Sequence, residues 1–184
     1  MEEYVDVLDE AGNLTGQKKL KSEVHRDGDW HRSIHLWIIN SKRELLIQRR
    51  AAQKENHPNM WDIPSAGHIS AGEDPITAAL RETEEELGLK LETSEIEHLF
   101  TVAQTGVTNN GTFINNEFND VYMVQKDIDI SQLSLQEEEV AEVRFISFLE
   151  LERAIESKDG NFVSHFQEYP KLFSELHRRF PSSK

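Results

Sequence analysis

The chain has 184 residues, of which 37% are hydrophobic and 29% are charged, and it contains no cysteine. This length suits one sizeable hydrophobic core and is short for two domains, while the missing thiols exclude disulfides, thiolate metal sites and cysteine nucleophiles. The formal net charge of −14 argues against a nucleic-acid polymer or an anionic membrane as partner, because phosphates and lipid headgroups attract basic surfaces.

The first part of the chain contains several short segments that predict strands. Residues 4–16 alternate apolar and polar side chains around a turn signal, which predicts a hairpin within an N-terminal segment of about residues 1–30. Residues 33–40 and 44–49 are two further strand-like runs joined by a short polar turn. The polar residues that follow, 51–60, predict a loop.

A helix is predicted next, and its two ends are marked by suitable residues. Asp74 is a good N-cap, and Pro75 suits the first helical position. Gly88 suits the position after the last turn, where the backbone becomes left-handed. The helix therefore runs from about Pro75 to Leu87. Its apolar face consists of Ile76, Ala79, Leu80, Thr83 and Leu87.

The rest of the chain predicts three more strands and two helices. Strands are expected at 96–107 and 119–126, with an exposed loop at 108–117 between them, and at 140–147. Two helical patterns, at about 148–157 and about 165–180, make up a C-terminal helical segment of about residues 148–180. In the second pattern, apolar residues recur every three to four positions, which predicts core or dimer packing. These residues are Phe166, Tyr169, Leu172, Phe173, Leu176 and Phe180.

Such an order of elements predicts a single mixed α/β domain over residues 1–184. Most strand pairs look antiparallel, and helices are inserted between them. Burying these elements on both faces of one sheet gives an α/β/α layered arrangement. No apolar run approaches the length of a membrane span, and no signal-like segment opens the chain. We therefore expect a cytoplasmic protein with no membrane partner.

Three glutamates share a second face of the predicted helix. Glu82, Glu85 and Glu86 are related by i, i+3 and i+4, so their carboxylates converge, whereas Glu84 points elsewhere. They lie near the negative end of the helix dipole, where anions are unfavourable. Mg²⁺ or Mn²⁺ would relieve this repulsion, because both ions prefer oxygen ligands. The glutamates alone also fit a solvent-exposed acidic helix, so both interpretations stay open at this point.

A longer pattern surrounds these glutamates. Five residues separate Gly67 from Glu73, and seven separate Glu73 from the run 81–89, RETEEELGL. The spacing resembles the Nudix box, G-x5-E-x7-R-E-U-x-E-E-x-G-U, where U is a bulky apolar residue. Only Thr83, at the first U position, departs from it. The order of strands and helices also resembles the Nudix (MutT-like) fold over most of the chain, which implies an α/β/α sandwich with a mixed central sheet.

The resemblance implies a hydrolase that directs water at a phosphorus atom of a diphosphate linkage. Glu82, Glu85 and Glu86 would bind the catalytic Mg²⁺ or Mn²⁺, which neutralises phosphate charge and lowers the pKa of bound water. Glu85 is the preferred residue for the base or for orienting the water. Glu139, in an acidic segment before a strand, is a second candidate for this role. A solvated acidic turn explains Glu139 equally well.

The resemblance also assigns structural roles to four positions of the box. Arg81 would pair with Glu73 and hold the loop against the helix. Gly67 and Gly88 would set the backbone at the two ends of the motif.

Several residues outside the box resemble those of the isopentenyl-diphosphate isomerase branch. His25, His31, His68 and Glu117 fall at places where that enzyme binds a metal. Ala66 stands where the isomerase has its catalytic cysteine, and alanine can neither transfer a proton nor form a thiolate. The resemblance therefore implies a hydrolase in an isomerase-like branch. The histidines leave two interpretations open, a second metal site or ordinary packing near the substrate.

The residues leave three functions open. The first is a metal-dependent pyrophosphohydrolase that acts on a nucleoside diphosphate derivative or a related small-molecule diphosphate. The second is an isomerase-like enzyme, and the third is a catalytically silent nucleotide-binding module. The intact glutamate set favours the first. A homodimer is compatible with the sequence. The expected substrate-binding residues are Arg49, Arg50, His68 and Glu117.

Overall fold

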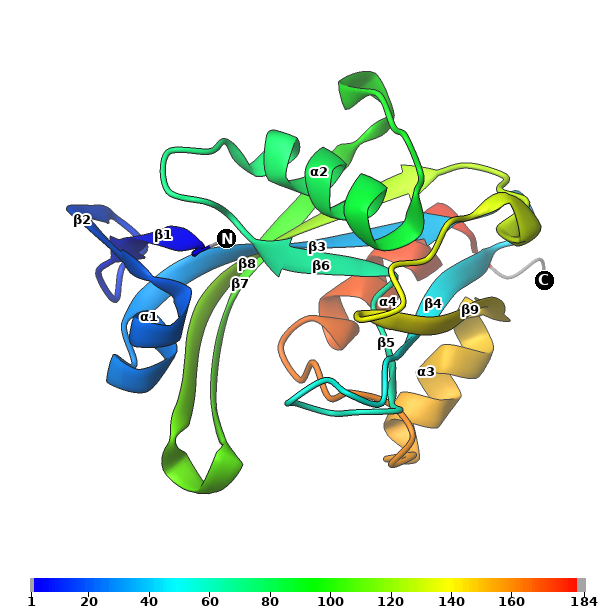
Figure 1. The fold of residues 1–184 in the computed structure, drawn as a ribbon. Helices are drawn as coiled ribbons and strands as arrows, with labels where there is room; N and C mark the ends of the chain where they lie inside the picture. Colours follow the sequence, from blue (N-terminus) through cyan, green and yellow to red (C-terminus); the bar gives the residue numbers. More distant parts are fainter. Residues whose placement is uncertain (1, 182–184) are drawn as a thin grey trace.

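A mixed sheet forms the centre of the protein, and the computed structural model describes it within residues 2–181 (Figure 1). The strands are β1 (Tyr4–Leu8), β2 (Leu14–Leu20), β3 (Trp30–Ile39), β4 (Glu44–Arg50), β5 (Trp61–Asp62), β6 (Ser65–His68), β7 (Glu97–Thr108), β8 (Phe113–Gln125) and β9 (Val140–Ser147). The helices are α1 (Lys21–Asp27), α2 (Pro75–Leu87), α3 (Phe148–Glu156) and α4 (Tyr169–Arg179). Within these residues, no helix combines the length and the apolar character that crossing a membrane requires.

Strand β3 is the hub of the sheet. It pairs antiparallel with β1, β4 and β6, and parallel with β8. The parallel register sets His31 opposite Glu117, and the antiparallel register sets Ser33 opposite His68. Polar side chains from three strands therefore meet on one face of the sheet.

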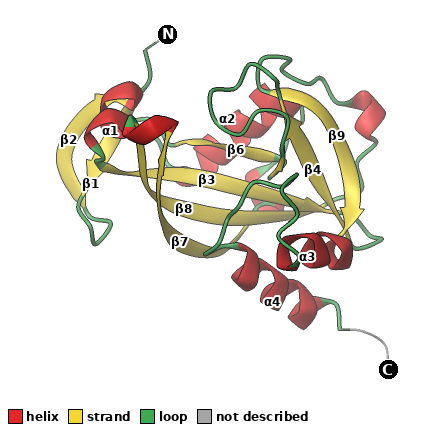
Figure 2. Cartoon of the chain, turned by 90° about the horizontal axis from the view of Figure 1, so that it is seen from below, coloured by secondary structure: helices red, strands yellow, loops and turns green. Residues whose placement is uncertain are grey.

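The helices cover both faces of the sheet. Side chains of β3 alternate between the faces, and Ile34, Leu36 and Ile38 pack in the cluster that includes residues of α2. Trp37 and Ile39 pack in the opposite cluster, which includes residues of α3 and α4. Figure 1 shows α2 on one side of the sheet and α3 and α4 on the other, and Figure 2 shows α3 and α4 from below. The predicted α/β/α arrangement with a mixed sheet is confirmed.

Helix α2 begins and ends where its capping residues predict. The side chain of Asp74 accepts hydrogen bonds from the backbone N–H groups of Ile76 and Thr77, both at 3.1 Å. Gly88 follows the last turn with φ of 65°, and its N–H donates to the carbonyl oxygen of Glu84. Local chemistry thus fixes both ends of the helix that carries the glutamates.

Other elements differ from the prediction in their boundaries. The predicted loop at 108–117 is wrong in its second half, because β8 begins at Phe113 and continues the hairpin with β7. Helix α4 begins at Tyr169 rather than near 165, so Phe166 lies outside it and is 80% exposed. The sequence reading also missed α1, β5 and β6. These three elements are short, and the sequence of β6, SAGH, has no β-branched or aromatic residue.

Candidate active site

Glutamates 82, 85 and 86, called the glutamate cluster below, line a cavity of about 770 Å³. Their surroundings differ. The side chain of Glu85 is 55% exposed, whereas that of Glu82 is 13% exposed and Glu86 is buried. One carboxylate oxygen of Glu86 accepts a hydrogen bond from the backbone N–H of Ala66 at 3.2 Å. Strand β6 therefore fixes the innermost carboxylate, while Glu85 stays accessible from the cavity.

The two inner carboxylates of the cluster resist ionisation in the metal-free protein. Burial raises the pKa of Glu86 to about 8, and the nearby carboxylate of Glu82 adds to this rise. Burial also raises the pKa of Glu82, although the guanidinium of Arg81 opposes it. A cation between these oxygens would favour their charged forms. The electrostatics therefore fit a site for a hard divalent ion.

Arg81 ties the helix to the loop that precedes it. Its guanidinium donates two hydrogen bonds to Glu73, at 3.0 and 2.9 Å, and one to the backbone carbonyl oxygen of His68 at 3.1 Å. It also donates to Glu82 at 2.8 Å and lies 3.4 Å from Glu85. One side chain thus holds the loop and orients two members of the glutamate cluster.

The two arginines at the end of β4 have different positions. Arg50 lines the cavity, where its guanidinium donates to Asp62 at 3.1 Å and to the carbonyl oxygen of Asn56. Arg49 does not line the cavity and instead faces Glu142 at 3.2 Å. Alternation along a strand sends neighbouring side chains to opposite faces, so of this pair only Arg50 can reach a ligand in the cavity.

Glu139 also lines the cavity, next to the glutamate cluster. Its carboxylate forms an ion pair with the ammonium group of Lys54, which lines the cavity too. The carboxylate contributes to the raised pKa of Glu86. The structure thus places Glu139 within the cavity, but with a cation already beside it.

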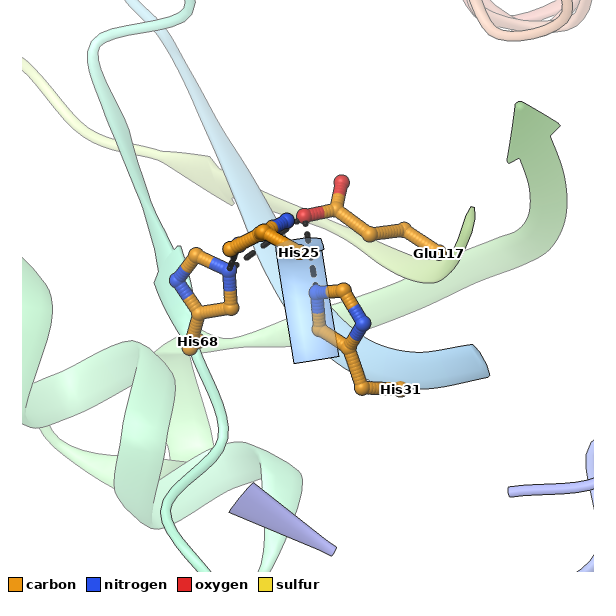
Figure 3. A group of neighbouring side chains, drawn as sticks. All are labelled: His25, His31, His68 and Glu117. Carbon is orange, nitrogen blue, oxygen red and sulfur yellow. Dashed lines mark hydrogen bonds and ion pairs between the residues drawn. The ribbon is translucent and has the colours of Figure 1, made fainter. Parts of the chain in front are cut away.

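His25, His31, His68 and Glu117, called the histidine cluster below, come from four different elements and meet in the same region. They belong to α1, β3, β6 and β8, and Figure 3 shows their side chains pointing toward one another. The Nε2 atoms of His25 and His68 are 3.1 Å apart. Oε1 of Glu117 lies 3.3 Å from Nε2 of His31 and 3.4 Å from Nε2 of His68.

The histidine cluster has the features of a metal site. The Nδ1 atoms of His31 and His25 contact the backbone carbonyl oxygens of Asp29 and Ile114, at 3.0 and 3.3 Å. These contacts orient each ring so that Nε2 faces the other members, as in many metal-binding histidines. The Nε2 atom of His31 is buried and makes no hydrogen bond within residues 2–181. Three nitrogens and one carboxylate oxygen therefore fit a transition-metal ion.

The protonation states of the histidine cluster agree with this interpretation. Burial lowers the pKa of His25 to about 4, and the neighbouring His68 and His31 contribute. Burial also lowers the pKa of His68. Burial opposes ionisation of Glu117, but the imidazoles of His31 and His68 hold its pKa well below the usual range. The lowered pKa values of His25 and His68 favour the neutral imidazole, which is the form that binds a metal, and the lowered pKa of Glu117 favours the carboxylate.

A group of polar side chains lies beside this cluster, and sequence reasoning missed three of them, Ser33, Gln104 and Asn119. Ser33 donates a hydrogen bond to the amide oxygen of Asn119 at 2.7 Å. The amide nitrogen of Asn119 and the amide oxygens of Asn115 and Gln104 are buried without hydrogen-bond partners within residues 2–181. All four residues line the cavity. No sequence motif marks Ser33, Gln104 or Asn119, because the pairing of β8 with β3 and β7 brings them together.

Comparison with known proteins places the chain in a family. The NUDIX domain family model matches residues 29–166. Nudix hydrolase 3 of Arabidopsis thaliana is 45% identical over 97% of this chain, which spans 24% of that longer protein. The uncharacterized Nudix hydrolase lmo0368 of Listeria monocytogenes is 39% identical over 90% of each chain. An isopentenyl-diphosphate Delta-isomerase of Pectobacterium atrosepticum is 31% identical, over 89% of this chain and 87% of that protein.

A solved structure agrees on the fold. The crystal structure of DR0079 from Deinococcus radiodurans superimposes with a TM-score of 0.69, over 97% of this chain and 99% of that one, at 19% sequence identity. Taken with the family match and the two Nudix relatives, the chain belongs to the Nudix hydrolases, enzymes that act on phosphoric anhydride bonds.

Proposed function

We propose that the protein is a Mg²⁺- or Mn²⁺-dependent pyrophosphohydrolase that cleaves the diphosphate linkage of a small molecule. The observation that carries this proposal is the convergence of Glu82, Glu85 and Glu86 on one cavity, with basic side chains in the same lining. Carboxylates supply the oxygen ligands that Mg²⁺ prefers, and substrate phosphates supply others. A nucleoside diphosphate derivative is the first candidate for the substrate.

The residues of the cavity have separate tasks in this reaction. A divalent ion bound to the glutamate cluster would neutralise phosphate charge and lower the pKa of the attacking water. Arg81 holds Glu82 and Glu85 in place through its guanidinium. The exposed carboxylate of Glu85 is free to accept a proton from the water, because its oxygens are less enclosed than those of Glu86.

Basic side chains face the same space and suit the substrate phosphates. Arg50 and Lys54 line the cavity, and each already forms an ion pair that keeps its side chain in position. A guanidinium can contact two phosphate oxygens at once. Glu139 is paired with Lys54, so we assign it to orienting that lysine and keep Glu85 as the base.

An isomerase-like activity is the second candidate, and the histidine cluster favours it. That cluster fits a transition metal, and a curated isomerase is a relative of the chain. The alkene isomerisation would require proton transfer on both faces of a double bond, and Ala66 has no group that can supply one of them. We therefore rank hydrolysis first and assign the histidine cluster to binding a second metal ion, with His68 and Glu117 facing the substrate.

A substrate panel tests the reaction class. The panel consists of nucleoside diphosphates, nucleoside triphosphates, nucleotide sugars and isoprenoid diphosphates, each with Mg²⁺ or Mn²⁺ and with a chelator as control. We expect release of phosphate, pyrophosphate or a monophosphate ester only with metal. Conversion of isopentenyl diphosphate to its isomer without hydrolysis would overturn the proposal. The variant Ala66→Cys, which restores the thiol, is the control that shows whether the assay can detect isomerisation in this scaffold.

A further inference from the structure

A second group of histidine and carboxylate side chains lies beside the same cavity, which its two histidines line. His35 belongs to β3, whereas His165 and Glu168 come from the segment that precedes α4. All three side chains are buried, and one nitrogen or oxygen atom of each lies within 4.8 Å of the others. We call these three residues the His35 site. None of them belongs to the glutamate cluster or to the histidine cluster.

The hydrogen bonds around His165 fix which of its ring nitrogens is free. Its Nε2 atom lies 2.7 Å from Oδ1 of Asp62. Asp62 also accepts hydrogen bonds from Arg50 at 3.1 Å and from the backbone N–H of Ile63 at 2.8 Å. A carboxylate surrounded by donors accepts from the imidazole as well, so in the neutral imidazole the proton lies on Nε2 and Nδ1 has the lone pair.

The nitrogen of His165 that does not contact Asp62 is Nδ1. The Nδ1 atom is buried and makes no hydrogen bond to any residue that the structure describes. Leaving a polar atom buried and unpaired is unfavourable, so such an atom calls for a ligand. Metal-binding histidines in proteins usually donate their other ring N–H to a carboxylate, which is the arrangement of His165 and Asp62.

Glu168 is held in a similar way from the other side. The indole N–H of Trp37 donates to Oε1 of Glu168 at 2.6 Å. The second oxygen, Oε2, lies 2.5 Å from Nδ1 of His35. The indole therefore fixes the orientation of the carboxylate and leaves one oxygen directed at the imidazole of His35.

The buried carboxylates around the site carry more negative charge than the neighbouring arginine balances. Asp62 and Glu168 are two buried carboxylates. Among the arginine and lysine side chains of residues 2–181, Arg50 alone forms an ion pair with either of them. One guanidinium cannot balance two carboxylates, so an additional positive charge is needed, either a proton on an imidazole or a metal ion.

We propose that His35, His165 and Glu168 bind a divalent transition-metal ion of the Zn²⁺ class. Two imidazoles and one carboxylate are a known ligand set for Zn²⁺ and for Fe²⁺, and they leave coordination positions open. His35 and His165 line the cavity, so the open positions face the space that a substrate would occupy. Mg²⁺ does not suit the site, because it prefers oxygen ligands in octahedral geometry.

This ion is separate from the one that the histidine cluster fits. His31 and His35 both lie on β3, four residues apart and on the same face of the sheet. At a rise of about 3.3 Å per residue, their Cα atoms are about 13 Å apart. The same distance makes it possible to remove one site by substitution without touching the other.

Zn²⁺ titration of four proteins by calorimetry tests the proposal. The chelator-treated wild type, His31→Asn, His165→Asn and the double variant are compared in excess Mg²⁺, which occupies carboxylate-only sites. We expect His165→Asn to bind one Zn²⁺ fewer than the wild type, and the double variant to bind one fewer than His31→Asn. Equal stoichiometry with and without His165 would overturn the proposal. His177→Asn, which changes an exposed histidine on α4, is the matched control and should change nothing.

Two further measurements test the site even if His165→Asn fails to fold. Asp62→Asn keeps all three ligands but weakens the support of His165, so Zn²⁺ affinity should fall about 10- to 100-fold at unchanged stoichiometry. In the wild type, imidazole nitrogen chemical shifts report metal binding directly. Zn²⁺ should move the His165 Nδ1 and His35 Nδ1 signals, and unchanged signals at saturating Zn²⁺ would show that the three residues are only a hydrogen-bonded contact between β3 and the segment that precedes α4.

Discussion

The carboxyl group of Glu82 occupies the space that a side chain on Gly67 would need. A Cβ atom built at position 67 would lie 2.1 Å from Cδ of Glu82 and 2.2 Å from its Oε1. Any side chain at position 67 would therefore have to displace the carboxyl group of Glu82 from its present position. The glycine of the box acts here by allowing a carboxylate, and any metal ion it holds, to reach the cavity.

Substitution Gly67→Ala should therefore displace Glu82 and impair metal-dependent turnover. A misplacement of about 1 Å in a catalytic group can cost about 100-fold in rate, and we expect a loss of this order in kcat/KM. The comparison variant is Gly160→Ala, because a Cβ at that position meets no atom within 4 Å. Steady-state kinetics at saturating Mg²⁺ measure both. Full activity in a folded Gly67→Ala protein would contradict the assignment of Glu82.

Substitution of the two neighbouring arginines of β4 tests which of them binds the substrate phosphates. Arg50 lines the cavity and Arg49 does not. Arg50→Ala should lower kcat/KM about 10- to 100-fold, the size expected for a lost charge-assisted hydrogen bond, whereas Arg49→Ala should change it little. Because Arg50 also pairs with the buried Asp62, thermal unfolding must show that the variant remains folded. Equal effects of the two substitutions would place the substrate phosphates elsewhere.

The raised pKa of Glu86 predicts how the free energy of unfolding depends on pH. Its pKa is about 8 in the folded, metal-free protein, against a value of 4.5 for an unperturbed side chain. The folded state therefore binds the proton more tightly than the unfolded state does, and stability falls as pH rises from about 4.5 to about 8. Glu86→Gln removes this penalty, so the variant should exceed the wild type in stability by a margin that grows over this range.

We expect the gain at pH 8 to be at least about 1 kcal/mol, since each pKa unit corresponds to about 1.4 kcal/mol. This should raise the midpoint of thermal unfolding by about 2–4 °C in the presence of a chelator. Mg²⁺ should stabilise the wild type and have less effect on Glu86→Gln. A variant that is less stable than the wild type at pH 8 would show that the buried carboxylate is favourable without metal.

Local chemistry made part of this structure predictable. Helix α2 follows from Asp74, Pro75 and Gly88, whose effects act within a few residues. The start of β8 was missed because Asn115 and Asn116 lie in it, and pairing with β7 outweighs their low strand propensity.

The placement of functional residues depended more on tertiary structure. The parallel register of β3 and β8 brings His31 to Glu117, and no local pattern encodes that register. His35 and Glu168 are 133 positions apart and belong to no motif, so only the packing of α4 under the sheet reveals their contact. The sequence alone does not show which of Arg49 and Arg50 faces a ligand. Because side chains alternate along β4, Arg50 lines the cavity and Arg49 does not.

We infer that a metal ion held by the glutamate cluster drives hydrolysis, and Glu84 provides the control for testing this role. Glu84 lies one residue from Glu85 on α2, but it pairs with Lys90 and does not line the cavity. The measurement is the Mg²⁺ dependence of turnover, on the best substrate of the panel, for the wild type, Glu85→Gln and Glu84→Gln. We predict that Glu85→Gln lowers kcat by about 100-fold or more, whereas Glu84→Gln matches the wild type. Equal turnover in the two variants, or turnover that persists without metal, would contradict a role of this metal ion in hydrolysis.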